Sequence, residues 1–161
     1  MKLLRITYLS LGSNLGDTLE NLQLATTLVG ERVGIVSKVS PVYRSPSWGF
    51  KSDDFLNCCL EVTTNLNPDD LLSAIHNIER SLGRERTAEE GYTARTIDID
   101  ILLYDNEFIF SPGLVVTHKH MLERKFVLGP LVDIAANVIH PIEKKRLAEC
   151  LAICPDETEI E

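Results

Sequence analysis

The sequence has no long apolar run, no cysteine pattern typical of a metal site, and few aromatic residues. Its four cysteines form no Cys-x-x-Cys pair, because Cys58 and Cys59 are adjacent and Cys150 and Cys154 lie four residues apart. This spacing argues against a zinc ribbon or a disulfide framework, so we expect free thiols. No segment approaches the roughly 20 apolar residues that a membrane helix needs. These absences exclude a membrane span and a disulfide-stabilised scaffold.

Positive charge is also scarce, since 16 basic residues face 24 acidic ones and the net charge is −8. Such a balance argues against a general nucleic-acid partner. The start of the chain lacks a secretory signal, which predicts a cytoplasmic protein without a membrane partner. Basic residues nevertheless gather between positions 80 and 125, and this favours a small polyanion as the ligand. They are Arg80, Arg84, Arg86, Arg95, Lys119, Arg124 and Lys125.

Repeats, linkers and low-complexity stretches are absent, so one catalytic domain is expected over 1–161, with an acidic, frayed tail at 155–161. Periodicity and breakers predict strands over 4–11, 34–44, 55–64 and 95–104, and helices over 17–30 and 67–82. A hairpin arm over 107–110 and short helices over 127–135 and 144–152 follow. This order predicts an α+β, ferredoxin-like βαββαβ sandwich. Its helices would pack on one face of an antiparallel sheet and leave the other face for ligands.

The helix boundaries rest on specific signals. Asp17 followed by Glu20 forms a capping box, and Asn67-Pro68 supplies a cap with proline in the first turn. Gly30 and Gly83 are expected to end the two helices. The polar stretch 84–94 has no periodicity and is expected to be a mobile loop.

The strand over 95–104 carries the most informative motif. Asp98 and Asp100 share one face, about 6.5–7 Å apart, while the alternate residues belong to the core. Those core residues are Ile97, Ile99, Ile101 and Leu103. Two carboxylates on one strand face repel, and magnesium ions bound with phosphate would remove the repulsion. The alternative for this motif alone is an exposed strand face that tolerates two acids.

Arginines flank the polar loop beside this strand. Arg84 and Arg86 lie at its start and Arg95 lies at its end. Guanidinium groups bind phosphate oxygens in pairs. Carboxylates for metal and arginines for phosphate together indicate phosphoryl transfer, although each arginine alone is compatible with a solvated surface charge.

Two further groups carry weaker signals. His118, His120 and Arg124 favour phosphate or nucleotide contact over zinc, because the other histidines are distant in sequence. An aromatic slot for a flat heterocycle is predicted where Ser45-Pro46-Ser47-Trp48 and Phe55-Leu56-Asn57 meet, with the Asn57 amide as a donor–acceptor edge. A turn beside a buried aromatic strand explains the same residues.

Over about residues 5–142 the chain resembles the 6-hydroxymethyl-7,8-dihydropterin pyrophosphokinase family. The segment from Arg95 to Asp100, Arg-x-x-Asp-x-Asp, is the most specific of the shared motifs. The others, in family order, are Gly12-Ser13-Asn14-Leu15, Tyr43-Arg44-Ser45-Pro46, Phe55-Leu56-Asn57, Ile78-Glu79, Gly83-Arg84, and His118 with Arg124 and Phe126. The resemblance implies transfer of diphosphate from ATP to the pterin hydroxymethyl group in folate biosynthesis, with AMP as the other product.

The resemblance also implies a role for each matched residue. Asp98 and Asp100 would bind two Mg²⁺ ions, and with Arg84 and Arg95, which would hold the transferred diphosphate, they form the catalytic set. The pterin pocket would comprise Ser45, Pro46, Trp48, Phe55, Asn57 and Phe126, with the ring stacked between the two phenylalanines. The ATP site would comprise Glu79, Arg84, Arg86, Tyr92, Arg95, Ile101, His118 and Arg124.

Some positions depart from the family, and two other functions account for parts of the sequence. Tyr92 stands near the usual tryptophan, Thr93-Ala94 replaces Gly-Pro, and Lys119 replaces a tyrosine. A nucleotidyltransferase would also combine a Gly-Ser loop with Asp-x-Asp, but Ser13 and Asp98 lie 85 positions apart (98 − 13). A non-enzymatic ferredoxin-like module that binds a regulator or RNA gives no reason for two aspartates within a strand. The sequence leaves the oligomeric state open, with a monomer favoured, and the expected partners are the small-molecule substrates ATP and the pterin.

Overall fold

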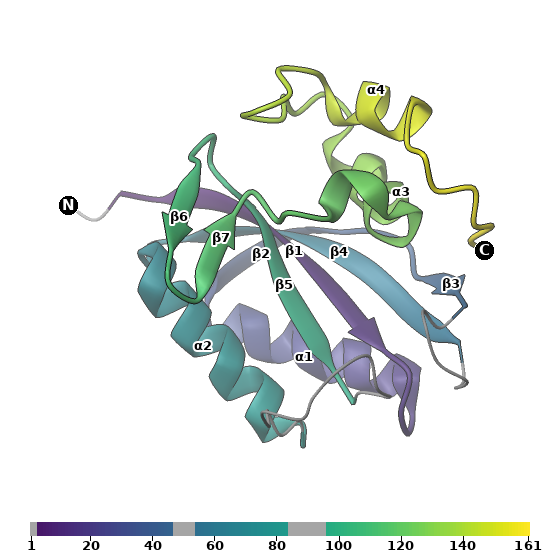
Figure 1. Ribbon diagram of the computed structural model, residues 1–161. Coiled ribbons are helices and arrows are strands. Elements are labelled where there is room, and N and C mark those ends of the chain that lie inside the picture. The colour runs from purple at the N-terminus through teal and green to yellow at the C-terminus, as the bar shows by residue number, and fades with distance from the viewer. Residues whose placement is uncertain (1–2, 47–53, 84–95) are drawn as a thin grey trace.

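A computed structural model describes residues 3–46, 54–83 and 96–161 of the chain (Figure 1). The strands are β1 (Arg5–Ser13), β2 (Gly34–Val39), β3 (Tyr43–Ser45), β4 (Phe55–Thr64), β5 (Asp98–Tyr104), β6 (Ile109–Ser111) and β7 (Leu114–Val116). The helices are α1 (Thr18–Arg32), α2 (Pro68–Ser81), α3 (Lys125–Ala135) and α4 (Leu147–Ala152), with a 3₁₀ turn at Met121–Glu123. No helix in the described ranges is both long and apolar enough to cross a bilayer.

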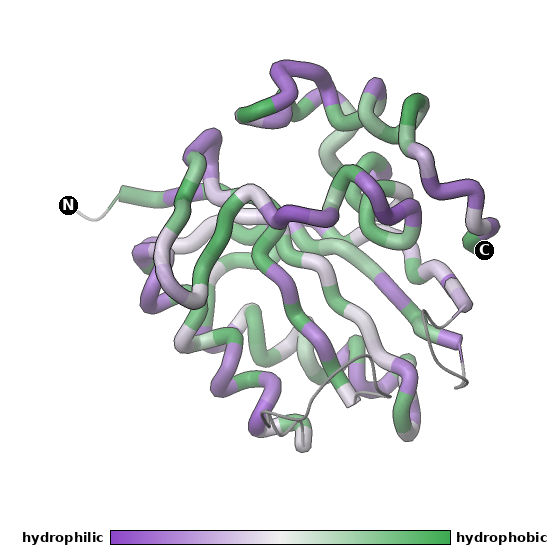
Figure 2. The backbone as a smooth tube through the Cα atoms, viewed as in Figure 1, coloured by the Kyte–Doolittle hydropathy of each residue, from purple (hydrophilic) through white to green (hydrophobic). Residues whose placement is uncertain are grey.

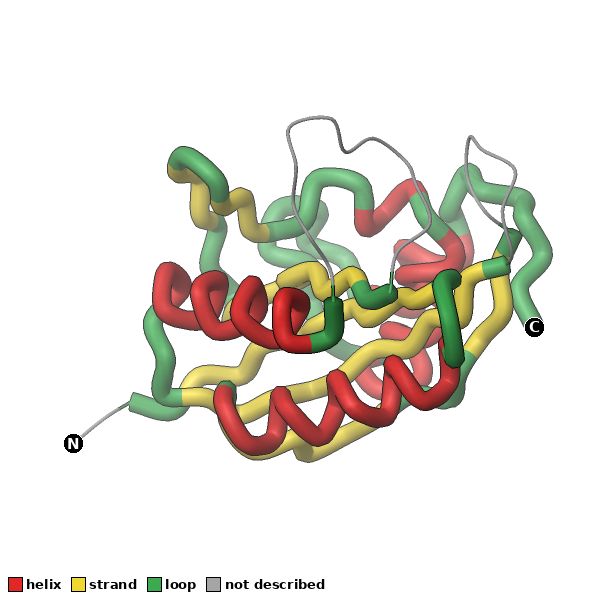
Figure 3. Tube along the Cα trace, turned by 90° about the horizontal axis from the view of Figure 1, so that it is seen from below, coloured by secondary structure: helices red, strands yellow, loops and turns green. Residues whose placement is uncertain are grey.

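The main sheet is antiparallel, with the strand order β2-β4-β1-β5, and β3 also pairs with β4. The predicted βαββαβ order and ferredoxin-like class are confirmed. Helices α1 and α2 cross one face of the sheet side by side (Figure 3). The capping signals also hold, since the side chains of Asp17 and Asn67 accept hydrogen bonds from the Glu20 and Asp70 N–H groups. Leu9, Leu11 and Ile75 are buried between these helices and the sheet.

The second face of the sheet is partly covered, so the prediction that it is open to ligands was only half right. Helix α3 is mainly hydrophobic (Figure 2) and packs against β4 and α4. Val127, Leu128 and Leu131 of α3 form a second buried cluster with Tyr8 and other sheet residues. An apolar helix must bury that surface against another element. On β5, Asp98 and Asp100 remain partly exposed.

Three local predictions were wrong. The strand predicted over 34–44 is two strands, because Ser40-Pro41 interrupts it and proline cannot donate to a ladder. Helix α1 continues through Gly30 to Arg32. A β-bulge opposite Tyr8 breaks the alternation of β5, so Leu103 packs in the second cluster and not with Ile101.

The last two differences concern the segments after β5. The arm at 107–110 was expected to pair with β5, but β6 pairs with β7. The tail was expected to be frayed. Instead Glu161 exchanges two backbone hydrogen bonds with Arg44, at 2.8 and 3.1 Å, and Asp156 binds the start of α3.

Candidate active site

The two aspartates of β5 lie on the face that α3 covers only in part. Their neighbours Ile99 and Ile101 are buried on the opposite face, as predicted. In the β1–β5 ladder Asp98 lies opposite Gly12, and Asp100 lies opposite Ser10. The side chain of Asp100 remains 38% exposed. The strand therefore presents both carboxylates toward a space that a ligand can reach.

Gly12 of β1 lies between the aspartates of β5 and a second polar group on β4. It pairs with Asp98 on one side and with Asn57 on the other, which places Asn57 about 10 Å across the sheet from Asp98. A Cβ atom at Gly12 would lie 3.0 Å from Asn57 Oδ1 and 3.6 Å from Phe55 Cδ1. Only glycine leaves this approach unobstructed.

The Asn57 amide is fixed in orientation. Its Nδ2 donates a 2.7 Å hydrogen bond to Ser45 Oγ, and Asn57 and Ser45 are both buried, at 3% exposure. Ser45 pairs with Phe55 in the β3–β4 ladder. A held amide beside an aromatic ring is suited to recognise the edge of a flat heterocycle. The predicted grouping of Ser45, Phe55 and Asn57 is thus present.

Arg124 and Phe126 lie at the beginning of α3. The guanidinium carbon of Arg124 lies 5.8 Å from the centroid of the Phe126 ring, within cation–π range. Helix α3 packs on β4, the strand that carries Phe55 and Asn57. The helix therefore brings an aromatic ring and a cation toward the same face of the sheet.

His118 connects this face to β5. Its backbone N–H donates to Leu102 O at 3.1 Å, and its Nε2 lies 3.8 Å from Asp100 Oδ2. Burial, aided by the charge of Arg124, lowers the pKa of His118 to about 4, although Asp98 opposes the shift. The ring is therefore neutral near pH 7. Because Nδ1 accepts a bond from the His120 N–H group, the ring proton belongs on Nε2, facing Asp100.

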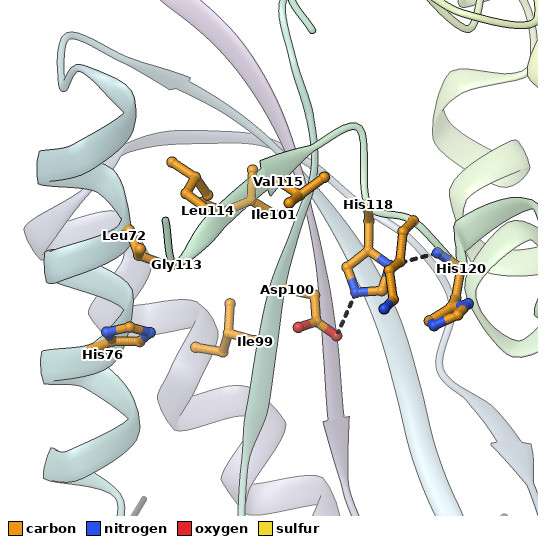
Figure 4. Close-up of a pocket in the computed structure, with 11 residues that line it drawn as sticks. Leu72, His76, Ile99, Asp100, Ile101, Gly113, Leu114, Val115, His118 and His120 are labelled. Carbon is orange, nitrogen blue, oxygen red and sulfur yellow. Dashed lines mark hydrogen bonds and ion pairs between the residues drawn. The ribbon is translucent and has the colours of Figure 1, made fainter. Parts of the chain in front are cut away.

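A pocket of about 270 Å³ opens beside these residues, between α2, β5 and the β6–β7 hairpin (Figure 4). Asp100, Ile101 and His118, which are among the predicted site residues, line it. Sequence reasoning did not assign His76 and Leu72, which line the pocket from α2. Their four-residue spacing places them on one face of the helix, and this was the available signal. The pocket thus joins an apolar wall to the carboxylate edge.

Glu79, predicted as an ATP contact, makes a contact with β5 in the structure. It is 1% exposed near the end of α2, and its Oε2 accepts a 3.0 Å hydrogen bond from Ile99 N. Ile99 stands between Asp98 and Asp100 along β5. The buried carboxylate therefore helps to set the position of the strand that carries both aspartates.

Several predicted residues fall outside the described ranges. The expected loop at 84–94 is among them. The residues concerned are Trp48, Arg84, Arg86, Tyr92 and Arg95. Pro46 is described and lies exposed directly after β3.

Magnesium suits the carboxylate pair better than a metal held by protein ligands alone. In the part of the chain that the structure describes, no three His, Cys, Asp or Glu side chains group to hold a metal ion. Mg²⁺ is commonly bound by one or two carboxylates together with substrate phosphates and water. Asp98 and Asp100, on one accessible strand face, fit that pattern.

Comparison with known proteins agrees with this geometry. The family model for 7,8-dihydro-6-hydroxymethylpterin-pyrophosphokinase (HPPK) matches residues 8–136. The chain is 43% identical over 143 residues to the 2-amino-4-hydroxy-6-hydroxymethyldihydropteridine pyrophosphokinase of Aquifex aeolicus, covering 88% of each protein. It is 46% identical over 136 residues to the bifunctional protein FolKE of Lactococcus lactis subsp. cremoris, but spans only 38% of that protein.

The fold has solved counterparts as well. A crystal structure of Plasmodium falciparum HPPK-DHPS superposes with a TM-score of 0.77 at 16% identity. The match covers 94% of this chain and 42% of the Plasmodium chain, so the similarity concerns the fold of one part of a larger protein. The extent of the family match, together with the Aquifex relative, shows that this chain belongs to the HPPK family.

Proposed function

We propose that this protein transfers the terminal diphosphate of ATP to the hydroxymethyl group of 6-hydroxymethyl-7,8-dihydropterin, releasing AMP and the pterin diphosphate. The observation that supports it most is the row across β5, β1 and β4, where Asp98, Gly12 and Asn57 are in register. One end of this row offers carboxylates for metal and phosphate. The other end offers a fixed amide and an aromatic ring for a heterocycle.

The nucleotide end is assigned to the pocket in Figure 4. Leu72, Ile101 and Leu114 supply apolar surface for a base or sugar, and His76 and His118 supply ring nitrogens. Asp100 lies at the same pocket, so the phosphates of a nucleotide bound there would extend along β5. Arg124 lies close enough to act electrostatically on His118 and adds positive charge nearby.

Asp98 and Asp100 would hold the proposed two Mg²⁺ ions, which would supply positive charge to offset that of the phosphates. Arg84 and Arg95 are proposed to bind the transferred diphosphate, with Arg86 and Tyr92 beside them. His118, neutral and protonated on Nε2, can donate a hydrogen bond to Asp100 or to a phosphate oxygen. Glu79 holds β5 through Ile99 N, which keeps the spacing of the two carboxylates.

The pterin end would bind through Asn57, which Ser45 orients, with the ring between Phe55 and Phe126 and the pocket completed by Pro46 and Trp48. The substrate hydroxyl would then attack the β-phosphorus in line. Such chemistry depends on positioning and charge neutralisation, so no nucleophile from the protein is required. A covalent phospho-enzyme isolated during turnover would contradict this mechanism.

A product assay tests the function directly. The protein is incubated with ATP, Mg²⁺ and the reduced hydroxymethyl pterin, and the nucleotide products are separated. AMP formed in step with pterin diphosphate supports the proposal. ADP would indicate transfer of a single phosphate, and free pyrophosphate would indicate nucleotidyl transfer. Omission of the pterin is the control, because it should abolish AMP formation.

A further inference from the structure

Residues 155–161 form an extended segment that lies against the protein surface. Asp156, Thr158 and Ile160 are partly buried, and the residues between them are exposed. This two-residue period is that of a chain packed on one side. The family match ends at residue 136, so the segment lies beyond the part of the chain that the family describes.

One end of the segment holds the start of α3. Asp156 Oδ2 accepts a 3.0 Å hydrogen bond from Lys125 N, and Oδ1 accepts a 2.9 Å bond from Thr158 N. Arg124, the residue at the N-cap position of α3, makes no side-chain cap bond. Asp156 therefore acts as the cap of α3 from 31 residues away, and its negative charge complements the helix dipole.

The other end of the segment holds β3. Glu161 and Arg44 exchange the two backbone hydrogen bonds described above, directly before Ser45. Between the two ends, Ile160 packs over Gly129 of α3, where a Cβ atom would come within 2.6 Å of Ile160 Cδ1. The segment thus runs along α3 and ends on the edge of β3.

These two elements carry opposite walls of the proposed pterin pocket. Phe126 lies in the first turn of α3, and Ser45, which orients Asn57, is the last residue of β3. Farther along the helix, Tyr43 of β3 donates a 2.5 Å hydrogen bond to Asp133. Residues 155–161 provide a second link between α3 and β3, at the end of α3 that bears Phe126.

We infer that residues 155–161 act as a strap that sets the position of Phe126 relative to Ser45 and Asn57, with Asp156 as a positioning residue for pterin binding. The inference rests on the proposed function, because it assigns the pocket to the pterin. Without the cap, the first turn of α3 frays and Phe126 loses its fixed place. The pocket between α2 and β7, to which ATP is assigned, is lined by no residue of α3, so ATP binding depends on this strap less than pterin binding does, through Arg124 alone.

The test compares Asp156→Ala and Asp156→Asn with Glu157→Ala, which removes the same charge from an exposed neighbour. Dissociation constants for the pterin and for ATP are measured separately by calorimetry on the full chain, and thermal unfolding is followed in parallel. A lost helix cap costs about 1 kcal/mol. Pterin affinity should fall by the equivalent factor of about five, because binding then has to restore the first turn of α3. We expect that loss for Asp156→Ala, an intermediate loss for Asp156→Asn, and ATP affinity within about twofold of wild type.

Each possible result either supports or overturns the proposed role of the strap. Unchanged pterin affinity in a folded Asp156→Ala protein, or an equal loss for ATP and pterin, would overturn the strap. If Asp156→Ala does not fold, the same comparison applies to Asp156→Asn, which keeps one acceptor oxygen. A wild-type protein that forms no AMP and binds no pterin refutes the proposed function itself. That outcome is distinct from a wild type that binds pterin while the variants bind it equally well.

Discussion

At the scale of single residues, the carboxylates of β5 are expected to contribute little to stability and much to catalysis. Asp98 and Asp100 face the same side of one strand, where like charges oppose each other. Aspartate is also a poor strand former. Stability alone therefore gives no reason for this pair, whereas two cations between carboxylates and phosphates do.

Replacing either aspartate by asparagine should remove activity without removing the fold. We expect kcat to fall at least about 100-fold, because metal-ion stabilisation of the transition state is worth several kcal/mol. In EDTA, urea unfolding should show equal or slightly higher stability, since the repulsion is relieved. Glu31→Gln, on an exposed position of α1, is the matched control and should leave both properties unchanged. A large loss of stability without metal would show that the aspartates are structural.

For Glu79 we expect the opposite effect of substitution, a loss of stability. Glu79→Ala leaves the buried Ile99 N–H group without its acceptor, which should lower the free energy of unfolding by about 1–3 kcal/mol. Glu79→Gln keeps a carbonyl oxygen in the same place and should recover at least half of the loss. Urea denaturation measures both. If Glu79→Ala keeps full stability and only raises the KM for ATP, the residue acts as a nucleotide contact and not as a support for β5.

At the scale of elements, β1 is the strand that joins the two halves of the site. Gly12 lies between Asp98 of β5 and Asn57 of β4, and the Asn57 amide cannot move away easily because Ser45 holds it. A side chain at this position would therefore crowd the recognition edge. The separation of roughly 10 Å between the two functional ends follows from the spacing of two strand pairs.

Gly12→Ala should weaken pterin binding about fivefold, because overpacking of this kind typically costs about 1 kcal/mol or more. ATP affinity should change by less than about twofold, since Gly12 does not line the pocket beside α2. Calorimetric titration with each substrate measures both values. Gly30→Ala is the control: its new Cβ would meet only Val36 Cγ2, at an ordinary 3.9 Å, within helix α1. Wild-type pterin affinity in Gly12→Ala would contradict this account of the glycine.

Elements with strong local signals were predictable from the sequence, and those that depend on tertiary contacts were not. The caps at Asp17 and Asn67 are local and were located correctly, as was the alternation from Ile97 to Ile101. The bulge that moves Leu103 to the other cluster lies where β5 pairs with Tyr8 and Leu9 of β1, and no periodicity reveals it. For His76 the only local signal was its four-residue spacing from Leu72, because its relevance depends on the strands that α2 faces.

At the scale of the whole molecule, two separately packed cores lie on opposite faces of the sheet that carries the site. One core joins α1 and α2 to the sheet, and the other joins α3 and α4 to it. The apolar pattern over 127–135 predicted a helix but gave no indication of which surface it covers. Packing of α3 on β4 covers part of the second sheet face, and it gives residues 155–161 a surface to bind.

Whole-molecule stability should fall as the pH drops from 7 toward 5, because of the buried His140 and the partly buried His118. Burial lowers the pKa of His140, whose Nδ1 accepts hydrogen bonds from the Ile142 and Glu143 N–H groups. As the pH falls through about 6.5, this histidine therefore binds a proton in the unfolded chain but not in the folded protein. The free energy of unfolding declines as a result. His118, with its pKa near 4, contributes in the same direction.

The variant His140→Asn separates this contribution from the rest. Asparagine presents Oδ1 where the ring presents Nδ1, so it can accept the same two N–H groups, but it does not titrate. We expect stability near that of wild type at pH 5, and a shallower slope between pH 7 and pH 5 in urea unfolding without Mg²⁺. The remaining slope is assigned to His118. Because the largest cause of the shift is burial and not a charged neighbour, raising the salt concentration should change the wild-type slope little. Parallel pH profiles for wild type and variant would show that His140 does not couple protonation to folding.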